Sequence, residues 1–433
     1  MSKYILAKIR NKKIKVGIIG LGYVGLPLAI RFLNKKISVQ GIENDTQKIN
    51  LIKRGICYIE NKKFGKNHFF KNFFKYVSSD YSVLKNVDII IICLPTPLDK
   101  FNKPDITILK KCALKLRKYL KNNQAFILES TVYPGATFEI FKILNKYKNL
   151  KIGKNFNLIF SPERENPGDK KFSYKSTPKV VSGYSTVCSK VALNLYKLIA
   201  NKVFLAKSII VAEMSKLLEN TYRSVNIGLV NEFKIISNKL GLNVWDVIEA
   251  AKTKNFGYRS FNPGPGVGGH CIPIDPIYLS WLMGKQKYKT KIIEISSKLN
   301  SSMPNWVFNQ ICKHLRRKNL NLKKLIFIGV AYKKNTSDTR GSPSIDIIKK
   351  FLKKKFSIKY YDPYVKEIPL KDKFFNNSSL SFASTKKLSS NSIVIIGTDH
   401  LNVNYKSILK SAKIVFDTRG VLKNHKSKKI IFV

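Results

Sequence analysis

The chain has 433 residues, 44% of them hydrophobic, and its 80 Lys and Arg against 26 Asp and Glu give a formal charge of +54. A chain of this length and apolar content can bury large cores, which excludes disorder, collagen and a disulfide-held miniprotein. The sequence has no apolar run long enough for a membrane span and no signal-peptide core at its start. We therefore expect a soluble, cytoplasmic protein without a membrane partner.

The positive charge is spread along the whole chain. Only 11 of the 80 basic residues are Arg, while Lys, Asn, Ile, Phe and Tyr are frequent throughout. A nucleic-acid-binding surface usually concentrates its basic residues on one element, so this pattern favours compositional bias over a specific nucleic-acid partner. The six cysteines are widely spaced without a CxxC pair, which is typical of reduced thiols, and we assign no metal site.

The first half of the chain alternates short β-branched runs with helical stretches. This alternation predicts βαβ units and a parallel sheet, which we assign to an N-terminal domain over residues 1–206. The expected strands are 14–20, 37–43, 87–94, 124–130, 178–183 and 202–206.

The first expected strand runs into the motif GLGYVGLP, which includes Tyr23 and Val24 and spaces Gly20, Gly22 and Gly25 as GxGxxG. Glycines at this spacing allow a tight turn and the close approach of a pyrophosphate to a helix N-terminus. Glu43 ends the second strand, 23 residues after Gly20, where a carboxylate can accept hydrogen bonds from the adenosine ribose. A carboxylate there repels a 2′-phosphate, so the pattern favours NAD over NADP.

Three later loops carry polar residues at the expected carboxyl edge of this sheet. Thr96 lies in CLPTPLD and Thr131 in ESTVYPG, where either could bind a ligand or simply form a turn. Glu163 and Arg164 lie in SPERENPGD (161–169), after a short strand, where they could meet a substrate or form a surface ion pair.

The middle of the chain, residues 207–312, is expected to be helical. A helix over 209–240 places Glu213, Lys216, Asn220 and Arg223 on one face, and it should end near Gly241. A second helix is expected over 243–253.

The motif FNPGPGVGGHCIPIDP (261–276) is the strongest chemical signal. Its glycines and prolines can wrap closely around a ligand just before Cys271, and Asp275 follows four residues later. A thiol in such a loop can attack an aldehyde when a base or cation activates it. His270 is interpreted as structural, because adjacent side chains point apart in most backbones.

Residues 313–433 are expected to form a second α/β domain after a linker helix and turn at 313–324. The loop GVAYKKNTSDTRGSPS (329–344) lacks GxGxxG, which disfavours a second dinucleotide site. Its cations Lys333, Lys334 and Arg340 could instead bind a phosphate or nucleotide, or lie on a solvated surface turn. The expected strands are 325–331, 356–362, 392–398 and 412–418.

Taken together, these motifs resemble the UDP-glucose/GDP-mannose dehydrogenase family over residues 15–421. The resemblance implies an α/β fold of two Rossmann-like doubly wound domains joined by a central helical region. It also implies NAD as cofactor, a UDP-sugar substrate and a homodimer formed through the central helices. The implied reaction is oxidation of the C6 alcohol to a carboxylate with two NAD and one water, supplying bacterial capsule or lipopolysaccharide synthesis.

The resemblance also assigns roles to residues. Cys271 corresponds to the nucleophile, and Lys216 and Asn220 would hold the C6 oxygen. Asp275 would position Lys216 and a water, while Glu163 and Thr131 would assist thioester hydrolysis. The implied cofactor contacts are Gly20, Gly22, Tyr23, Val24, Gly25, Glu43, Thr96 and Thr131. The implied substrate contacts are Glu163, Arg164, Lys216, Asn220, Arg259, Phe261 to Gly266, Lys333, Arg340 and Arg419.

The forms SPERENPGD and GGHCIPIDP look most like the branch that oxidises UDP-N-acetylhexosamines, particularly UDP-N-acetylglucosamine. UDP-N-acetylgalactosamine and UDP-glucose are the alternative substrates.

Two other classes of protein are alternatives to this family. A nucleic-acid-binding protein would leave Cys271 and Glu43 unused, and a one-step 3-hydroxyacid dehydrogenase has neither a nucleophilic cysteine nor a C-terminal nucleotide domain.

Overall fold

The computed structural model describes residues 2–433 except 60–61, 66–67, 165–175, 319–323 and 381–391. The chain forms two compact units, Met1–Glu219 and Asn220–Val433. Each unit contains a largely parallel sheet with helices on both faces, so the predicted α/β fold with two Rossmann-like domains and a helical centre is confirmed. Our division into residues 1–206, 207–312 and 313–433 stays a prediction.

The first unit is built on a seven-stranded sheet of order β2-β1-β5-β6-β7-β8-β9. All six strands predicted for this region are present. The expectation of a fully parallel sheet is wrong at one place, because β7 and β8 pair antiparallel. An antiparallel strand begins at the edge where its neighbour ends, so this step needs no crossover helix. The strands are β1 (Lys15–Ile19), β2 (Ser38–Ile42), β5 (Ile89–Ile92), β6 (Gln124–Leu128), β7 (Phe156–Phe160), β8 (Lys179–Gly183) and β9 (Val203–Leu205).

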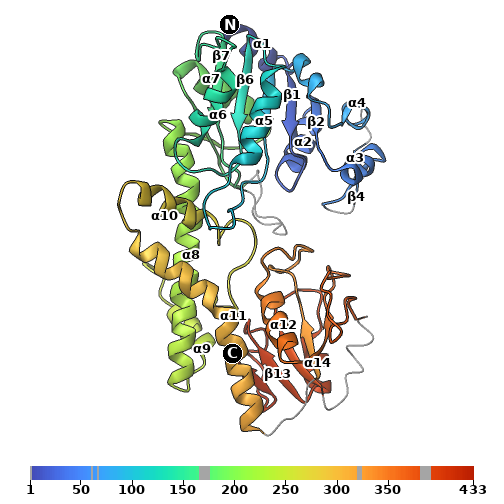
Figure 1. Cartoon of the computed structure of the whole chain (residues 1–433), viewed down its shortest axis with the longest axis vertical. Helices are drawn as coiled ribbons and strands as arrows, with labels where there is room; N and C mark the ends of the chain where they lie inside the picture. Colours follow the sequence, from blue (N-terminus) through green and yellow to red (C-terminus); the bar gives the residue numbers. More distant parts are fainter. Residues whose placement is uncertain (1, 60–61, 66–67, 165–175, 319–323, 381–391) are drawn as a thin grey trace. The chain divides into compact units, whose positions relative to one another are not determined.

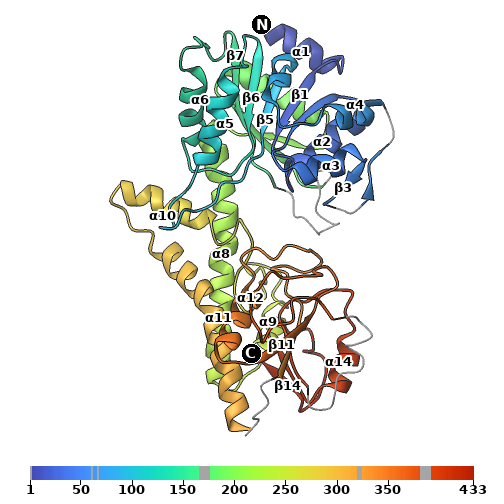
Figure 2. The same ribbon diagram turned by 45° about the vertical axis from the view of Figure 1, so that its right-hand side comes forward.

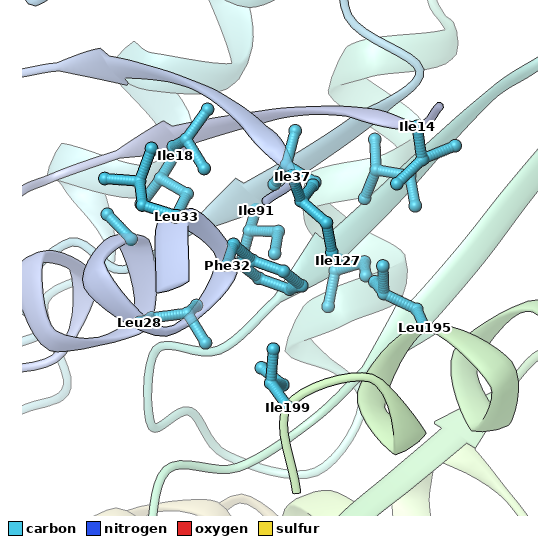
Figure 3. Close-up of a cluster of buried hydrophobic side chains, with 14 of the residues drawn as sticks. Ile14, Ile18, Leu28, Phe32, Leu33, Ile37, Ile91, Ile127, Leu195 and Ile199 are labelled. Carbon is cyan, nitrogen blue, oxygen red and sulfur yellow. The ribbon is translucent and has the colours of Figure 1, made fainter. Parts of the chain in front are cut away.

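Helices cover both faces of this sheet. Because side chains alternate along a strand, Ile18, Ile91 and Ile127 share one face. Figure 3 shows them gathered with Phe32 of α2 (Gly25–Asn34) and Leu195 of α7 (Thr186–Lys197). This core also takes in apolar residues of α1 (Ser2–Arg10), a helix that the sequence did not suggest. On the other face α5 (Thr107–Arg117) and α6 (Ala136–Asn145) lie side by side (Figures 1 and 2).

Smaller elements follow β2 along the chain. They lie around β2, the edge strand of the sheet, and α4 packs against β2. They are α3 (Thr46–Lys53), the hairpin β3 (Ile56–Cys57) and β4 (Lys62–Lys63), α4 (His68–Tyr76) and the 3₁₀ helix η1 (Tyr81–Asn86).

Four helices form the middle of the chain. The predicted helices are confirmed as α8 (Ile209–Lys239) and α9 (Val244–Ala251). Gly241 separates them with a φ of 71°, and the Asn243 side chain caps α9 by accepting from the Trp245 N–H. They are followed by α10 (Asp275–Lys285) and α11 (Lys291–Arg317). The expected linker helix at 313–324 is the end of α11, and residues 319–323 lie outside the described residues.

The second unit contains a parallel five-stranded sheet of order β11-β10-β12-β13-β14. The last half of α11 and α12 (Pro343–Lys353) pack on one face, and α14 (Tyr405–Ser411) packs on the other. Within the described part of the chain, no helix is both long and apolar enough to span a membrane. The strands are β10 (Lys324–Ile328), β11 (Ser357–Tyr361), β12 (Ile393–Ile396), β13 (Ile414–Asp417) and β14 (Ile430–Phe432), of which β14 was not predicted.

Candidate active site

The glycine turn after β1 lies where the strand order of the first sheet reverses, between β1 and β5. Gly20 has a φ of 86°, and a Cβ there would come within 2.8 Å of the Cys93 carbonyl oxygen. A Cβ on Gly25 would lie 1.9 Å from the Gly20 carbonyl oxygen, whereas one on Gly22 would meet no atom within 4 Å. The turn is therefore packed against β5 but open at Gly22, as a pyrophosphate at the start of α2 requires.

Glu43 is fixed beside this turn at the end of β2. One carboxylate oxygen accepts from the Leu21 N–H at 3.1 Å, and the other accepts from the N–H groups of Asn44 (2.9 Å) and Asp45 (3.1 Å). These contacts place a carboxylate next to the glycine turn, where it fits the ribose hydroxyls of NAD. Tyr23 is exposed in the turn, and Val24 precedes α2.

The loops that follow β5 and β6 are hydrogen-bonded to each other. The Thr96 hydroxyl donates to the Thr131 carbonyl at 2.7 Å, and the Ser130 hydroxyl donates to the Leu94 carbonyl at 2.7 Å. The structure therefore brings the two predicted threonines together at the carboxyl edge of the sheet. Thr131 is half-buried.

Glu163 and Arg164 both have partners within the first unit. The Arg164 guanidinium donates to the Pro178 carbonyl (2.9 Å) and pairs with Glu219 of α8 (2.6 Å), so the predicted alternative of an ion pair is present. Glu163 accepts from the Arg164 N–H at 2.8 Å and from Lys179 at 3.1 Å. We did not single out Lys179 from the sequence. The signal that could have identified it is a lysine at the start of an apolar strand. Residues 165–169 of this motif lie outside the described residues.

Helix α8 carries Glu213, Lys216 and Asn220 on one face, as expected. Glu213 is fully buried and accepts from the N–H groups of Gly135 (2.7 Å) and Thr137 (3.0 Å) and from the Thr137 hydroxyl (2.6 Å). It therefore caps the start of α6, a role that sequence reasoning missed. Lys216 is half-buried on the same helix.

Cys271 lies just before α10, is exposed, and forms no disulfide. Its carbonyl oxygen accepts from the N–H groups of Ile274 (3.1 Å) and Asp275 (2.8 Å), which turns the chain into the helix. The Asp275 carboxylate is buried and accepts from the Asn220 amide. Partial burial, together with the neighbouring Arg340, lowers the pKa of His270.

The glycine-rich loop before Cys271 lies against the C-terminal domain. A Cβ on Gly264 would come within 2.7 Å of the Arg419 guanidinium, and one on Gly268 within 2.5 Å of the Gly341 carbonyl oxygen. Gly266 has a φ of 138° and lies against Pro304 and Pro343. Glycine is therefore required at Gly268 by the close approach of the Gly341 backbone and is favoured at Gly266 by its positive φ.

Several cationic side chains surround this loop in the second unit. Arg419 donates through Nε to the Gly397 carbonyl at 3.0 Å, and Arg340 pairs with Asp338 while its carbonyl accepts from the Gly269 N–H at 3.1 Å. Lys234 of α8, which sequence reasoning missed, donates to the Thr418 carbonyl at 3.2 Å.

The other predicted substrate contacts are less enclosed. Phe261 is half-buried against the Tyr222 ring, Lys333 is half-buried, and Arg259 is exposed. In the described part of the chain, no cluster of His, Cys, Asp or Glu is arranged to hold a metal.

A Rossmann-type glycine turn followed by a carboxylate after the second strand, helices in the middle and a second parallel sheet are typical of two-domain NAD-dependent dehydrogenases. Comparison with known protein families identifies the family. The chain matches the UDP-glucose/GDP-mannose dehydrogenase family in its NAD binding domain (residues 14–200), central domain (210–302) and UDP binding domain (326–424). The chain therefore belongs to this family and is an NAD-dependent nucleotide-sugar 6-dehydrogenase.

Relatives of the chain match it over most of its length. It is 34% identical to Protein CapL of Staphylococcus aureus, covering 94% of this chain and 96% of the relative. It is 35% identical to a UDP-N-acetyl-D-glucosamine 6-dehydrogenase of Pseudomonas aeruginosa, covering 82% and 84%. Among solved structures, the UDP-D-ManNAc dehydrogenase of Pyrococcus horikoshii has a TM-score of 0.82 at 29% identity, covering 97% and 98%.

Proposed function

We propose that this enzyme oxidises the C6 alcohol of a UDP-N-acetylhexosamine to the uronate, with Cys271 as a covalent nucleophile. The observation that carries the proposal is the exposed Cys271 thiol at the end of a glycine loop that packs against the C-terminal domain, followed by the buried Asp275–Asn220 pair. The domain on which the loop packs matches the family's UDP binding domain, which supports a UDP-sugar held beside this cysteine.

The reaction requires two oxidations at one carbon. NAD, held at the Gly20–Gly25 turn and Glu43, would supply the hydride acceptor for both. The alcohol first becomes an aldehyde, which the Cys271 thiol captures as a thiohemiacetal. The second oxidation gives a thioester, and water hydrolyses it to the carboxylate and the free thiol. Covalent capture prevents the loss of a reactive aldehyde between the two oxidations.

The remaining site residues take the roles that the family resemblance implies. Lys216 and Asn220 stabilise negative charge on the C6 oxygen, with Asp275 orienting them and a water. Glu163 and Thr131 assist hydrolysis. The UDP group contacts Arg259, the Phe261–Gly266 loop, Lys333, Arg340 and Arg419, and Glu163 and Arg164 are the further substrate contacts that the resemblance implies.

The preferred sugar is proposed to be UDP-N-acetylglucosamine, and the product to enter bacterial surface polysaccharide. The Pseudomonas relative named for this sugar supports the choice. The Pyrococcus structure is named for UDP-D-ManNAc, so the C2 epimer joins the galactosamine and glucose substrates as an alternative. A panel of these four UDP-sugars, followed by NADH formation, tests the choice, and fastest turnover of any other sugar would overturn it.

The test of the mechanism is the Cys271→Ala variant. Wild type should form two NADH per sugar without free aldehyde, whereas the variant should lose uronate formation by roughly 10⁴-fold. NAD binding should persist because the Gly20–Gly25 turn is unchanged. Cys312→Ala, at a half-buried cysteine of α11, is the matched control and should keep full activity. Uronate formation by Cys271→Ala near the wild-type rate would refute the mechanism.

We further propose that the enzyme is a homodimer formed through α8. Large apolar side chains recur at steps of three, four and seven residues along this helix and are exposed in the single chain. Their spacing puts them on one stripe, and a continuous exposed apolar stripe marks a protein interface. The stripe consists of Val211, Met214, Leu218, Tyr222, Leu229, Phe233, Ile236 and Leu240.

A further inference from the structure

A buried cluster of charged side chains lies at the carboxyl edge of the seven-stranded sheet, and the mechanism described above does not use its central member. Lys179 is the first residue of β8 and is 2% exposed. Because β8 runs antiparallel to β7, its first residue lies at the edge where β6 and β7 end. The Lys179 ammonium is 2.9 Å from a Glu129 carboxylate oxygen and 3.1 Å from a Glu163 carboxylate oxygen.

The two carboxylates differ in depth. Glu129 directly follows β6 and its side chain is fully buried, with its second oxygen accepting from the Tyr196 hydroxyl of α7. The Glu163 side chain is 11% exposed, and its second oxygen accepts from the Arg164 N–H. Lys179 therefore connects a deep carboxylate, fixed by a helix, to the shallower Glu163, the residue proposed above to assist hydrolysis.

The charge of Lys179 is held by its partners. Burial alone lowers the pKa of a lysine, but the attraction of Glu129 and Glu163 outweighs it and the pKa of Lys179 is raised. Burial raises the pKa of Glu129, although Lys179 opposes that shift. An ammonium that stays protonated at hydrogen-bond distance favours the ionised form of Glu163 and fixes its orientation.

We propose that Lys179 is a positioning residue that holds Glu163 as an oriented carboxylate, ready to act as the base in thioester hydrolysis. This inference rests on the roles proposed above for Cys271 and Glu163. Water gives a proton to Glu163 as its oxygen attacks the acyl carbon. The carbon–sulfur bond then breaks, the Cys271 thiolate leaves, and the proton passes from Glu163 to sulfur. The product acid releases its remaining proton to solvent.

Removing the ammonium leaves Glu129 and Glu163 as two adjacent carboxylates in a buried setting. Like charges so placed disfavour double ionisation, so Glu163 would be protonated up to a higher pH. Among the described residues, the groups facing Glu163 include Lys179 from β8, Glu129 from the end of β6, the Cys93 thiol after β5, and Arg164 from its own loop, which is paired with Glu219 of α8. In Lys179→Met, the acid limb of the pH profile of kcat should therefore move to higher pH. In Lys179→Arg, it should lie close to its wild-type position.

The experiment separates the oxidations from hydrolysis. In Lys179→Met, a rapid burst of two NADH per site should persist while kcat falls by roughly 100-fold or more. Mass spectrometry should then find the sugar acyl group on Cys271. KM should change little, Lys179→Arg should restore most of kcat, and Lys197→Met, at an exposed lysine of α7, should resemble wild type.

Two outcomes would overturn the inference. One is a folded Lys179→Met enzyme with wild-type kcat and pH profile, and the other is equal loss of the burst and of steady turnover without an acyl-enzyme. If Lys179→Met does not fold, the double variant Lys179→Met with Glu129→Gln removes the uncompensated deep carboxylate and must show the same trapped acyl group. Wild type that forms one NADH per sugar would instead contradict the proposed function itself.

Discussion

Three buried charged residues of this chain differ in how their charge is compensated. Glu213 accepts three hydrogen bonds, and Lys179 has two carboxylate partners. Lys234 donates to one backbone carbonyl and lies over the Trp306 ring at 5.8 Å. Asp417 attracts Lys234 but does not outweigh its burial, and an incompletely compensated buried charge costs free energy, so the three residues should respond differently to substitution.

Lys234→Met should stabilise the second unit at neutral pH. Burial, with the nearby Arg419, lowers the pKa of Lys234 from 10.5 to about 7 in the folded state. The unfolded state therefore binds more protons between these pH values, and this lysine makes stability rise with pH across that window. The gain in unfolding free energy of Lys234→Met over wild type should be largest near and below pH 7 and shrink as the pH approaches 10.5.

Denaturant unfolding followed by tryptophan fluorescence measures this effect, because all three tryptophans lie in the second unit. Lys239→Met, at the exposed end of α8, is the control and should be neutral at either pH. A gain in stability that does not depend on pH would show that packing, and not charge, is responsible.

Glu43 should set the cofactor preference. Its carboxylate lies beside the glycine turn and would meet the 2′-phosphate of NADP as a like charge. We expect NAD to be preferred by at least roughly tenfold in kcat/KM, or about 1.4 kcal/mol, and Glu43→Gln to reduce that ratio. Initial rates with both cofactors measure the ratio, and equal kcat/KM in wild type would contradict the expectation.

At the scale of elements, α8 has two chemically opposite faces. One carries Glu213, Lys216 and Asn220, and its steps of three and four residues keep them in line along the helix. Successive residues of a helix are rotated by about 100°. This rotation places the apolar stripe from Val211 to Leu240 on the opposite side of the helix, about half a turn away. One helix therefore supplies both site residues and a surface suited to self-association.

The polar face of α8 also supports a neighbouring helix. Glu213 accepts from the first N–H groups of α6, which have no partner within that helix. Glu213→Ala should destabilise the first unit by roughly 2 kcal/mol, because buried donors lose their acceptor. Amide hydrogen exchange should speed up at Gly135 and Thr137. Glu232→Ala, at an exposed position of the same helix, should change neither quantity, and unchanged exchange in Glu213→Ala would contradict the cap.

At the scale of the whole molecule, the apolar stripe predicts the oligomeric state. We expect wild type to sediment as a dimer at micromolar concentration. Phe233→Glu combined with Ile236→Glu should give a folded monomer, because charges placed on the stripe oppose burial. Glu232→Lys, at the neighbouring exposed position, controls for the charge change and should stay dimeric. A monomeric wild type would contradict the proposed interface.

The sequence alone determined most strands of the two sheets and the two predicted central helices, because their hydrophobic periodicity and glycine and proline boundaries are local signals. It also located the glycine turn and the loop before Cys271, because few residue types permit those backbones. Glu43 was located by its position at the end of the second strand. Helix α1, the hairpin β3–β4 and strand β14 were missed, because short segments carry too little periodicity to stand out.

Only the tertiary structure decided which polar residues are partners. Lys179 meets Glu129 and Glu163 because β8 pairs antiparallel with β7, and no local pattern encodes that pairing. Glu213 binds the start of α6, 76 residues away, and Lys234 binds Thr418, 184 residues away. In the sequence these residues resemble other charged positions on solvated surfaces. Their burial, and therefore their energetic weight, depends on which distant segments pack against them.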